Sequence, residues 1–281
     1  MRGRGPRNGR PHVLILVQNL PVPFDRRVWQ EALALAGAGY EVHVICPATK
    51  EHPRRRETLH GVRIYRYPPG PEARRPAAYL AEYLIAILAQ LRIAVRIRLR
   101  HRLEIVHICN PPDLLFLVAL PLVALGASLV YDHHDACPEL MIAKGQREDG
   151  WQVRLLRLLE RLTYRFADVS VETNESYRDI ALGRGGMSGE DVFVVRSAPE
   201  SSRFASARPD EKWRYGRKYL VGYVGVMGLQ DGLDYLIDAA QVLILQWRRQ
   251  DIQFVLVGTG PEFPRLRERV RSLGIGDQVV F

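Results

Sequence analysis

Residues 13–47, VLILVQNLPVPFDRRVWQEALALAGAGYEVHVICP, decide the fold of this chain. They open with five apolar residues, Val13–Val17, a short run rich in β-branched side chains that is typical of a strand buried on both faces. A loop with two prolines follows, and Asp25 stands where a helix would begin and can accept its free backbone N–H groups. Two glycines end the helix, and Tyr40–Cys46 is predicted to form a second strand. The stretch therefore predicts a right-handed βαβ unit in a parallel sheet.

The loop between the first strand and the helix is a candidate functional segment. In open α/β sheets ligands bind outside the carboxyl ends of the strands, which is where this loop is expected to lie. It has no G-x-G-x-x-G, so a nicotinamide-dependent enzyme is disfavoured. It offers hydrogen-bonding and charged side chains instead, namely Asn19, Asp25, Arg26 and Arg27. The alternative is that Asp25 only caps the helix and both arginines are solvated.

Composition narrows the class of protein. The chain has 281 residues, 47% of them hydrophobic, which is enough for one large or two medium domains with a real core. Its net charge of +9 suits phosphorylated substrates or an anionic membrane surface, and no nucleic-acid-binding motif is present, so a nucleic-acid partner is not expected. Three cysteines without C-x-x-C spacing indicate reduced thiols in a cytoplasmic protein. Residues 1–10 are basic and glycine-rich, and we expect a disordered tail.

A second basic feature lies in a predicted helix over Tyr79–Arg102. Arg92, Arg96 and Arg100 recur every four residues and therefore share one face, which can contact anionic lipid weakly. The alternative is a core helix with a solvated basic end. The apolar residues of this helix are expected to face the core, so deep insertion into a bilayer is not predicted.

Residues 114–131 carry no charge and approach the length of a membrane span. Pro121 interrupts the run, Gly126 is typical of a helix end, and the last residues continue into a polar segment as a strand would. We therefore expect a buried helix, turn and strand rather than a membrane-spanning segment.

The polar segment YDHHDACPE, residues 131–139, follows that strand and should lie at the same sheet edge as the Asn19–Arg27 loop. Its histidines, acids and cysteine suggest a metal site, but their spacing matches no usual zinc pattern, so no metal is predicted. The alternative for His134 is a histidine whose hydrogen bonds are made within the core.

The last part of the chain repeats the α/β pattern. Residues 201–217 are polar and charged and are expected to form an interdomain linker, and a second unit spans 218–281. Its first predicted strand leads into a glycine-containing turn, Gly225–Gly232, and then a helix. Backbone N–H groups at such a helix start attract phosphate groups.

The stretches LPVPFDRRVW (20–29) and YDHHDACPE resemble family 4 glycosyltransferases of the GT-B fold, and the first resembles those of a bacterial subgroup. The resemblance implies an α/β, GT-B-like protein, with an acceptor-side Rossmann-like domain over residues 11–200 and a nucleotide-sugar-binding second domain. It implies that His134, in the second stretch, contacts the donor sugar or the nearby backbone in the cleft. The residues it assigns are His134 and Asp135 as catalytic; Asn19, Asp25, Arg26, Arg27 and Glu139 on the acceptor side; and Gly225, Gly228, Gln230 and Gly232 at the donor diphosphate.

The chain departs from the family pattern in two places. Many members have Arg and Lys in the diphosphate turn, where this chain has Val226 and Asp231. The family's E-x7-E segment lies beyond residue 281, so the second Rossmann-like domain is expected to be truncated and the 281-residue chain inactive by itself.

The resemblance implies a retaining, metal-independent and cofactor-free glycosyltransferase. It would transfer sugar from a nucleotide-sugar to a lipid-linked or polysaccharide acceptor in cell-envelope or exopolysaccharide synthesis, in the cytoplasm or peripherally at the inner face of the plasma membrane. Two alternatives remain: a non-catalytic truncated module or scaffold, and a nucleotide-sugar epimerase of related architecture.

Overall fold

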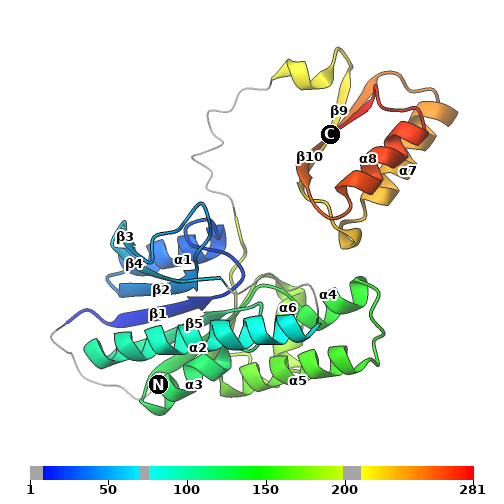
Figure 1. Cartoon of the computed structure of the whole chain (residues 1–281). Helices are drawn as coiled ribbons and strands as arrows, with labels where there is room; N and C mark the ends of the chain where they lie inside the picture. Colours follow the sequence, from blue (N-terminus) through cyan, green and yellow to red (C-terminus); the bar gives the residue numbers. More distant parts are fainter. Residues whose placement is uncertain (1–8, 70–75, 199–209) are drawn as a thin grey trace. The chain divides into compact units, whose positions relative to one another are not determined.

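The computed structural model describes residues 9–69, 76–198 and 210–281, and the side chains of 76–80 are not described. Most of the predicted basic tail therefore lies outside the described residues. The chain divides into two compact units, residues 1–198 and 199–281 (Figure 1). Each unit is an α/β structure.

The first unit contains eight strands and six helices among its described residues. The strands are β1 (His12–Val17), β2 (Glu41–Pro47), β3 (Arg56–Leu59), β4 (Val62–Tyr67), β5 (Leu103–Cys109), β6 (Ser128–His133), β7 (Val169–Glu172) and β8 (Val192–Val194). The helices are α1 (Arg26–Gly37), α2 (Pro76–Arg100), α3 (Phe116–Ala124), α4 (Cys137–Ala143), α5 (Trp151–Phe166) and α6 (Glu175–Leu182).

The strands form one sheet in the order β3-β4-β2-β1-β5-β6-β7-β8. All neighbouring pairs are parallel except β3 and β4, which are antiparallel. Strand β3 begins at Arg56 and occupies the edge of the sheet. Strand β4 is mostly buried, because β3 pairs with its outer edge and helices α1 and α2 contact it.

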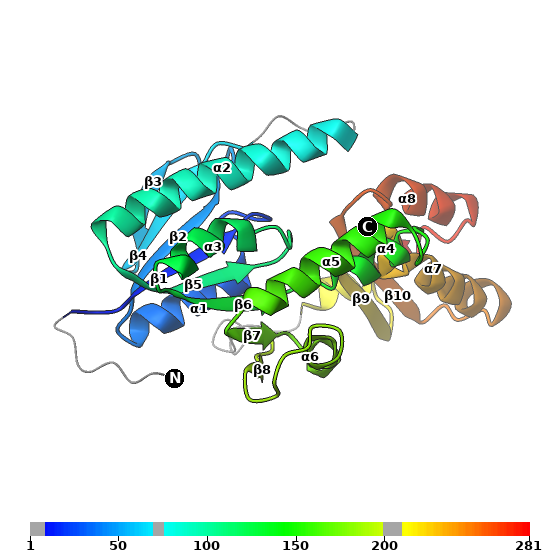
Figure 2. The same ribbon diagram turned by 90° about the horizontal axis from the view of Figure 1, so that it is seen from below.

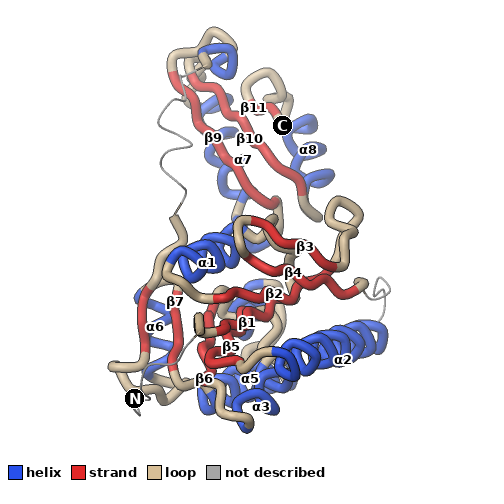
Figure 3. Tube along the Cα trace, turned by 90° about the vertical axis from the view of Figure 1, so that its left-hand side faces the viewer, coloured by secondary structure: helices blue, strands red, loops and turns tan. Residues whose placement is uncertain are grey.

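Helices cover both faces of this sheet. Figure 1 shows α1 on one face and α2, α3 and α5 on the other, and Figure 3 shows the same two layers from the side. Because side chains alternate along a strand, neighbouring residues of β1 enter opposite cores. Val13, Ile15 and Val17 pack toward α1, whereas Leu14 and Leu16 pack toward the α2 layer.

The uncharged run 114–131 forms helix α3, a turn and strand β6, as the sequence predicts. Pro121 lies inside α3 instead of ending it. Among the described residues, no helix combines the length and apolar character needed to cross a bilayer.

Helix α2 differs from the expectation in one respect. Its buried side includes Ala86, Ala94 and Ile97, but Leu88 is 64% exposed and Leu99 is 81% exposed. The apolar residues of α2 are therefore not all committed to the core, because only one side of the helix rests on the sheet. Figure 2 views the unit from the side of α2, α3 and α5.

The second unit contains a three-stranded parallel sheet in the order β11-β10-β9. Its elements are the 3-10 helix η2 (Glu211–Arg214), β9 (Tyr219–Val226), the 3-10 helix η3 (Leu229–Asp231), α7 (Leu233–Gln241), the π-helical turn η4 (Val242–Gln246), β10 (Ile252–Thr259), α8 (Phe263–Ser272) and β11 (Val279–Val280).

Two details of this unit concern the sequence predictions. Part of the predicted linker forms η2, which contacts β9 and β10, while residues 201–209 lie outside the described residues. In the sheet, β10 approaches β9 so closely that a Cβ on Gly258 would overlap the carbonyl oxygen of Gly225. Gly258 also has φ of +147°, a conformation that side chains rarely adopt.

Candidate active site

The candidate site lies at the carboxyl edge of the large sheet. Strands β1, β5, β6, β7 and β8 are parallel, so the segments that follow them meet at one edge. Asp132 is near the end of β6 and has no exposed surface. A buried carboxylate is costly unless it is paired, so its partners define the site.

Arg27 of α1 is the main partner of Asp132. Its Nη2 donates to Asp132 Oδ1 at 2.7 Å and its Nε donates to Oδ2 at 3.3 Å, which is a bidentate arrangement. Its Nη1 donates to the carbonyl of Val195 at 2.7 Å and to Ser197 Oγ at 3.1 Å. Arg27 thus ties α1 to the ends of β6 and β8. It is not the solvated arginine of the alternative interpretation.

Asp132 belongs to a larger cluster of ionisable groups on the α1 face. Burial alone would raise the pKa of Asp132, but the neighbouring imidazoles, His107 with Nε2 at 3.5 Å and His134 by a hydrogen bond, hold that pKa well below its usual range. The pKa of Glu31, which lies one turn after Arg27 in α1, is shifted in the opposite direction. Burial, reinforced by the negative Asp132 and opposed by His107 and Arg27, raises the pKa of Glu31 to about 7.

His134 comes directly after β6 and hydrogen-bonds Asp132 through Nε2. A carboxylate only accepts, so Nε2 carries a proton, and whenever the ring is neutral Nδ1 is an acceptor. Nδ1 makes no hydrogen bond with any residue that the structure describes. The pair therefore leaves an oriented acceptor at the sheet edge.

Asn110 holds the backbone of this loop in place. It follows β5 and is buried, and its Oδ1 accepts from His134 N at 2.6 Å and from Asp135 N at 3.1 Å. Its Nδ2 donates to the carbonyl of Asp135 at 2.7 Å and to Asp113 Oδ1 at 2.9 Å. Asn110 was not among the predicted site residues, although its place directly after a buried strand was a usable signal.

A second polar network lies on the other face of β6, because alternate side chains point to opposite faces. His133 Nδ1 lies 2.9 Å from Glu172 Oε2 and 2.8 Å from Tyr164 Oη, and all three residues are buried. Burial lowers the pKa of His133, but the bond with Glu172 outweighs it and the net shift is upward. This network joins β6, α5 and β7 beneath the site.

The predicted acceptor-side residues separate into different environments. Asn19 and Arg26 are exposed, whereas Asp25 caps α1 by accepting from Val28 N at 3.1 Å. Glu139 in α4 forms a bidentate pair with Arg184, at 2.5 and 2.8 Å, and Arg184 also binds the buried Glu160. The assignments of all these residues, and of Asp135, stay predictions.

Four side chains place potential metal ligands close together. Atoms of Glu31, Cys109, Asp132 and His134 lie within 4.8 Å of one another. Arg27, however, already binds both carboxylate oxygens of Asp132, and burial raises the pKa of the Cys109 thiol well above its usual value. A protonated thiol is a poor ligand, so this donor set favours ion pairing over a metal ion.

The predicted diphosphate residues lie in the second unit, at the end of β9 and the start of α7. Gly228 N donates to Asp231 Oδ2 at 2.7 Å, and Gly232 has φ of +68° directly before α7. Gln230 is exposed. The Asp231 carboxylate therefore already accepts the hydrogen bond of the Gly228 N–H, which is then not free for another acceptor. The sequence does not reveal this contact.

Each of the two units matches the model of a known protein family. The family model described as glycosyl transferase 4-like domain matches residues 25–198, well over half of the chain. The chain belongs to this glycosyltransferase family. The model described as glycosyl transferases group 1 matches residues 207–281. The predicted family is thereby confirmed, while the bacterial subgroup stays a prediction. No curated protein matches the sequence of this glycosyltransferase.

Solved structures share the fold at low sequence identity. Sucrose-phosphate synthase from Thermosynechococcus elongatus superposes with a TM-score of 0.72 at 16% identity, covering 97% of this chain and 70% of that one. Starch synthase IV from Arabidopsis thaliana, bound to ADP and acarbose, gives 0.60 at 14% identity, covering 97% and 73%.

A protein described as UDP-N-acetylglucosamine 2-epimerase from Listeria monocytogenes gives a TM-score of 0.60 at 13% identity, covering 97% of this chain and 68% of that one. The predicted GT-B-like α/β fold is confirmed by these likenesses. They show the fold and do not distinguish a transferase from an epimerase, whereas the family match places the chain among glycosyltransferases.

Proposed function

We propose that this glycosyltransferase moves a sugar from a nucleotide-sugar donor to an acceptor hydroxyl, with retention of configuration and without a metal ion. The observation that carries the proposal is the Arg27–Asp132–His134 arrangement at the carboxyl edge of the sheet, inside the region matched by the family. A fixed, partly buried imidazole at this edge is suited to contact a substrate.

In this proposal His134 acts through Nδ1. The Asp132 carboxylate holds the Nε2–H tautomer, and Arg27 fixes the orientation of that carboxylate by binding both of its oxygens. Nδ1 then accepts a hydrogen bond from a hydroxyl of the donor sugar and fixes its orientation. Asn110 keeps the loop backbone in place, so the imidazole is positioned before the substrate arrives.

The donor diphosphate is proposed to bind at the start of α7. Helix N-termini attract phosphate through free N–H groups and the helix dipole. The turn contains Gly225, Gly228, Gln230 and Gly232, and the small residues let a ligand approach the backbone. Asp231 has to release Gly228 N before a phosphate oxygen can take its place. One structural relative binds ADP, a nucleoside diphosphate.

The acceptor is proposed to be lipid-linked or a polysaccharide, which fits a role in cell-envelope or exopolysaccharide synthesis. A lipid-linked acceptor has to be met at a membrane surface. Arg92, Arg96 and Arg100 are exposed on α2 and are proposed to hold the cytoplasmic protein at the inner face of the plasma membrane.

The test uses a form of the protein with a complete second domain, because the 281-residue chain is expected to be inactive by itself. This form is titrated with UDP-, ADP- and GDP-sugars, and the sugar product is analysed with cell-envelope lipid extract as acceptor. Donor binding together with a new glycoside supports the proposal, and His134→Ala should abolish the glycoside while His52→Ala should not. Release of an epimerised free sugar would establish the epimerase alternative. Absence of any donor binding would favour a scaffold.

A further inference from the structure

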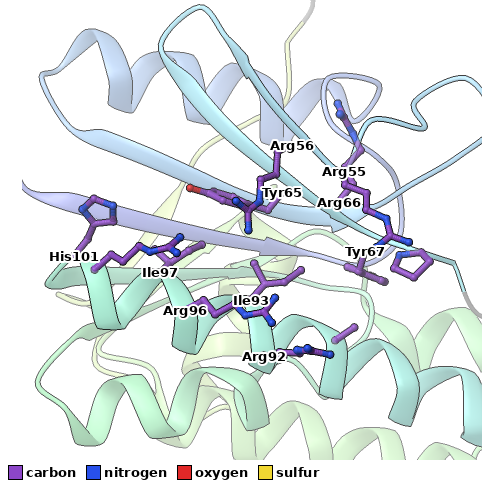
Figure 4. A pocket seen from close by; sticks show the side chains of 13 residues that line it. Arg55, Arg56, Tyr65, Arg66, Tyr67, Arg92, Ile93, Arg96, Ile97 and His101 are labelled. Carbon is purple, nitrogen blue, oxygen red and sulfur yellow. The ribbon is translucent and has the colours of Figure 1, made fainter.

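A cationic pocket lies on the first unit between α2 and the β3–β4 strands (Figure 4). Its volume is about 430 Å³, within the range of roughly 300–1,000 Å³ that is usual for small-molecule sites. Six arginines line it: Arg55, Arg56 and Arg66 from the strand side, and Arg92, Arg96 and Arg100 from α2. We call it the arginine pocket.

The arginine pocket lies on the α2 face of the sheet, whereas Arg27 and Asp132 lie on the α1 face, and Arg66 of its lining donates to the carbonyl of Val22 in the loop before α1 at 2.6 Å. Helix α2 follows β4 and leads into β5, so it runs antiparallel to the strands and its end, Arg100, lies near the amino edge of the sheet. His134 lies at the carboxyl edge. The pocket extends from Arg100 to Tyr67 at the carboxyl end of β4, and its lining includes neither Asp132 nor His134.

The positive charge of the pocket is not balanced by the protein. The carboxylate of Glu57 already forms ion pairs with Arg66 Nη1 at 2.9 Å and with Arg54 Nη1 at 3.5 Å. None of the other five lining arginines pairs with a carboxylate in the part of the chain that the structure describes. In Figure 4, Arg56 reaches from the strands toward α2, and Arg92 and Arg96 extend from the helix. Cations gathered in a concave site repel one another and attract an anion.

Two buried polar atoms of the lining also lack partners. Tyr67 is 3% exposed and Arg66 is 2% exposed, yet Tyr67 Oη and Arg66 Nε make no hydrogen bond with any described residue. Buried donors without partners are rare, and a bound ligand is one of the ways in which they are satisfied. Tyr67 thus provides a sign of a ligand that is independent of the arginine charges.

The exposed side of α2 also carries an apolar ridge beside these arginines. Its members recur at helical spacing on one side of the helix, and Leu99 is the most exposed of them. We define the leucine ridge as Leu84, Leu88, Val95 and Leu99. A helix with exposed leucines next to arginines is typical of one that lies in a membrane interface.

We propose that the arginine pocket binds the phosphate of an anionic phospholipid headgroup while the leucine ridge enters the adjoining boundary of the acyl chains. This specifies the membrane contact of the proposed function and rests on it. Arginine suits phosphate because its planar group donates several hydrogen bonds at once. The leucine ridge favours a lipid over a free phosphate compound, because only a lipid has acyl chains that the exposed leucines can contact.

The experiment is co-sedimentation of the whole chain with phosphatidylcholine vesicles that do or do not contain phosphatidylglycerol. Arg92→Gln/Arg96→Gln should weaken binding to the anionic vesicles by a factor of about 30, since each arginine near such a surface contributes a factor of about five. The matched control is Arg248→Gln/Arg267→Gln, which removes two exposed arginines of the second unit. It should weaken binding much less.

Three further measurements complete the test. Leu88→Ser/Leu99→Ser should weaken vesicle binding with the net charge unchanged, and circular dichroism should show that every variant is folded. If the two double-arginine variants lose the same amount of vesicle binding, the binding reflects the net positive charge and not the pocket, and the proposal is overturned. Binding of inorganic pyrophosphate in calorimetry without vesicle binding would assign a soluble ligand and overturn the lipid. Donor titration needs no vesicles, so it reports on the proposed transferase function separately.

Discussion

Replacing Glu31 by glutamine tests the electrostatics of the candidate site. Its side chain is 19% exposed and lies 3.2 Å from Arg27 Nε, yet burial raises its pKa to about 7. Gln resembles the protonated carboxyl group in shape and has no charge. The substitution should therefore have little effect on stability in acid and should stabilise the first unit in mild alkali.

The magnitude follows from the two pKa values of Glu31. Between its ordinary value of 4.5 and about 7, the folded carboxyl group binds a proton and the unfolded one does not. Stability contributed by this group is thus present at low pH and is lost as pH rises to about 7. At about 1.4 kcal/mol per pH unit, the loss amounts to about 3 kcal/mol. Glu31→Gln should be more stable than the parent by up to that amount at pH 8, and nearly equal at pH 5.

The assay is urea unfolding at pH 5, 6, 7 and 8, followed by tryptophan fluorescence. The chain has two units, so one global transition is not assumed. Trp213 and Trp247 are replaced by Phe in all proteins, which leaves the fluorescence to the first unit. Glu190→Gln, at an exposed position, is the control and should change nothing at any pH. The reasoning is refuted if Glu31→Gln differs from its parent by the same amount at pH 5 and pH 8.

Three other substitutions test the site and the second unit. His134→Ala should lower sugar transfer by at least about a hundredfold but unfolding free energy by only about 1 kcal/mol, and normal activity would show a structural role only. Asn110→Ala should lower the unfolding free energy by about 3 kcal/mol and loosen the loop, because the N–H groups of His134 and Asp135 lose their acceptor. Unchanged hydrogen exchange of these two amides would contradict the prediction. Gly258→Ala should unfold the second unit, since the new Cβ overlaps the Gly225 carbonyl, whereas Gly276→Ala has open space and serves as the control in thermal denaturation.

Local chemistry made several elements predictable. The apolar run Val13–Val17 is β1 within one residue, and Asp25 caps α1 as proposed. Helix α5 spans the amphipathic stretch Trp151–Phe166, and Asn174 caps α6 by accepting from Tyr177 N. These features depend on hydrophobic periodicity and on side chains that bond the backbone nearby, which a sequence displays directly. The antiparallel strand β3 was missed because its pairing with β4 is not encoded in an apolar pattern.

The sequence by itself determined the α/β class, the position of the polar loops at one sheet edge and, through its motifs, the glycosyltransferase family. Only the tertiary structure decided which side chains meet there. Arg27 and Asp132 are 105 residues apart, and their pairing depends on strands β1, β5 and β6 being neighbours. Tertiary packing also set the charge states, since burial raises the pKa of Glu31 whereas the neighbouring His107 and His134 lower that of Asp132. It also left Leu99 exposed on α2, because a helix resting on a sheet can bury only one side.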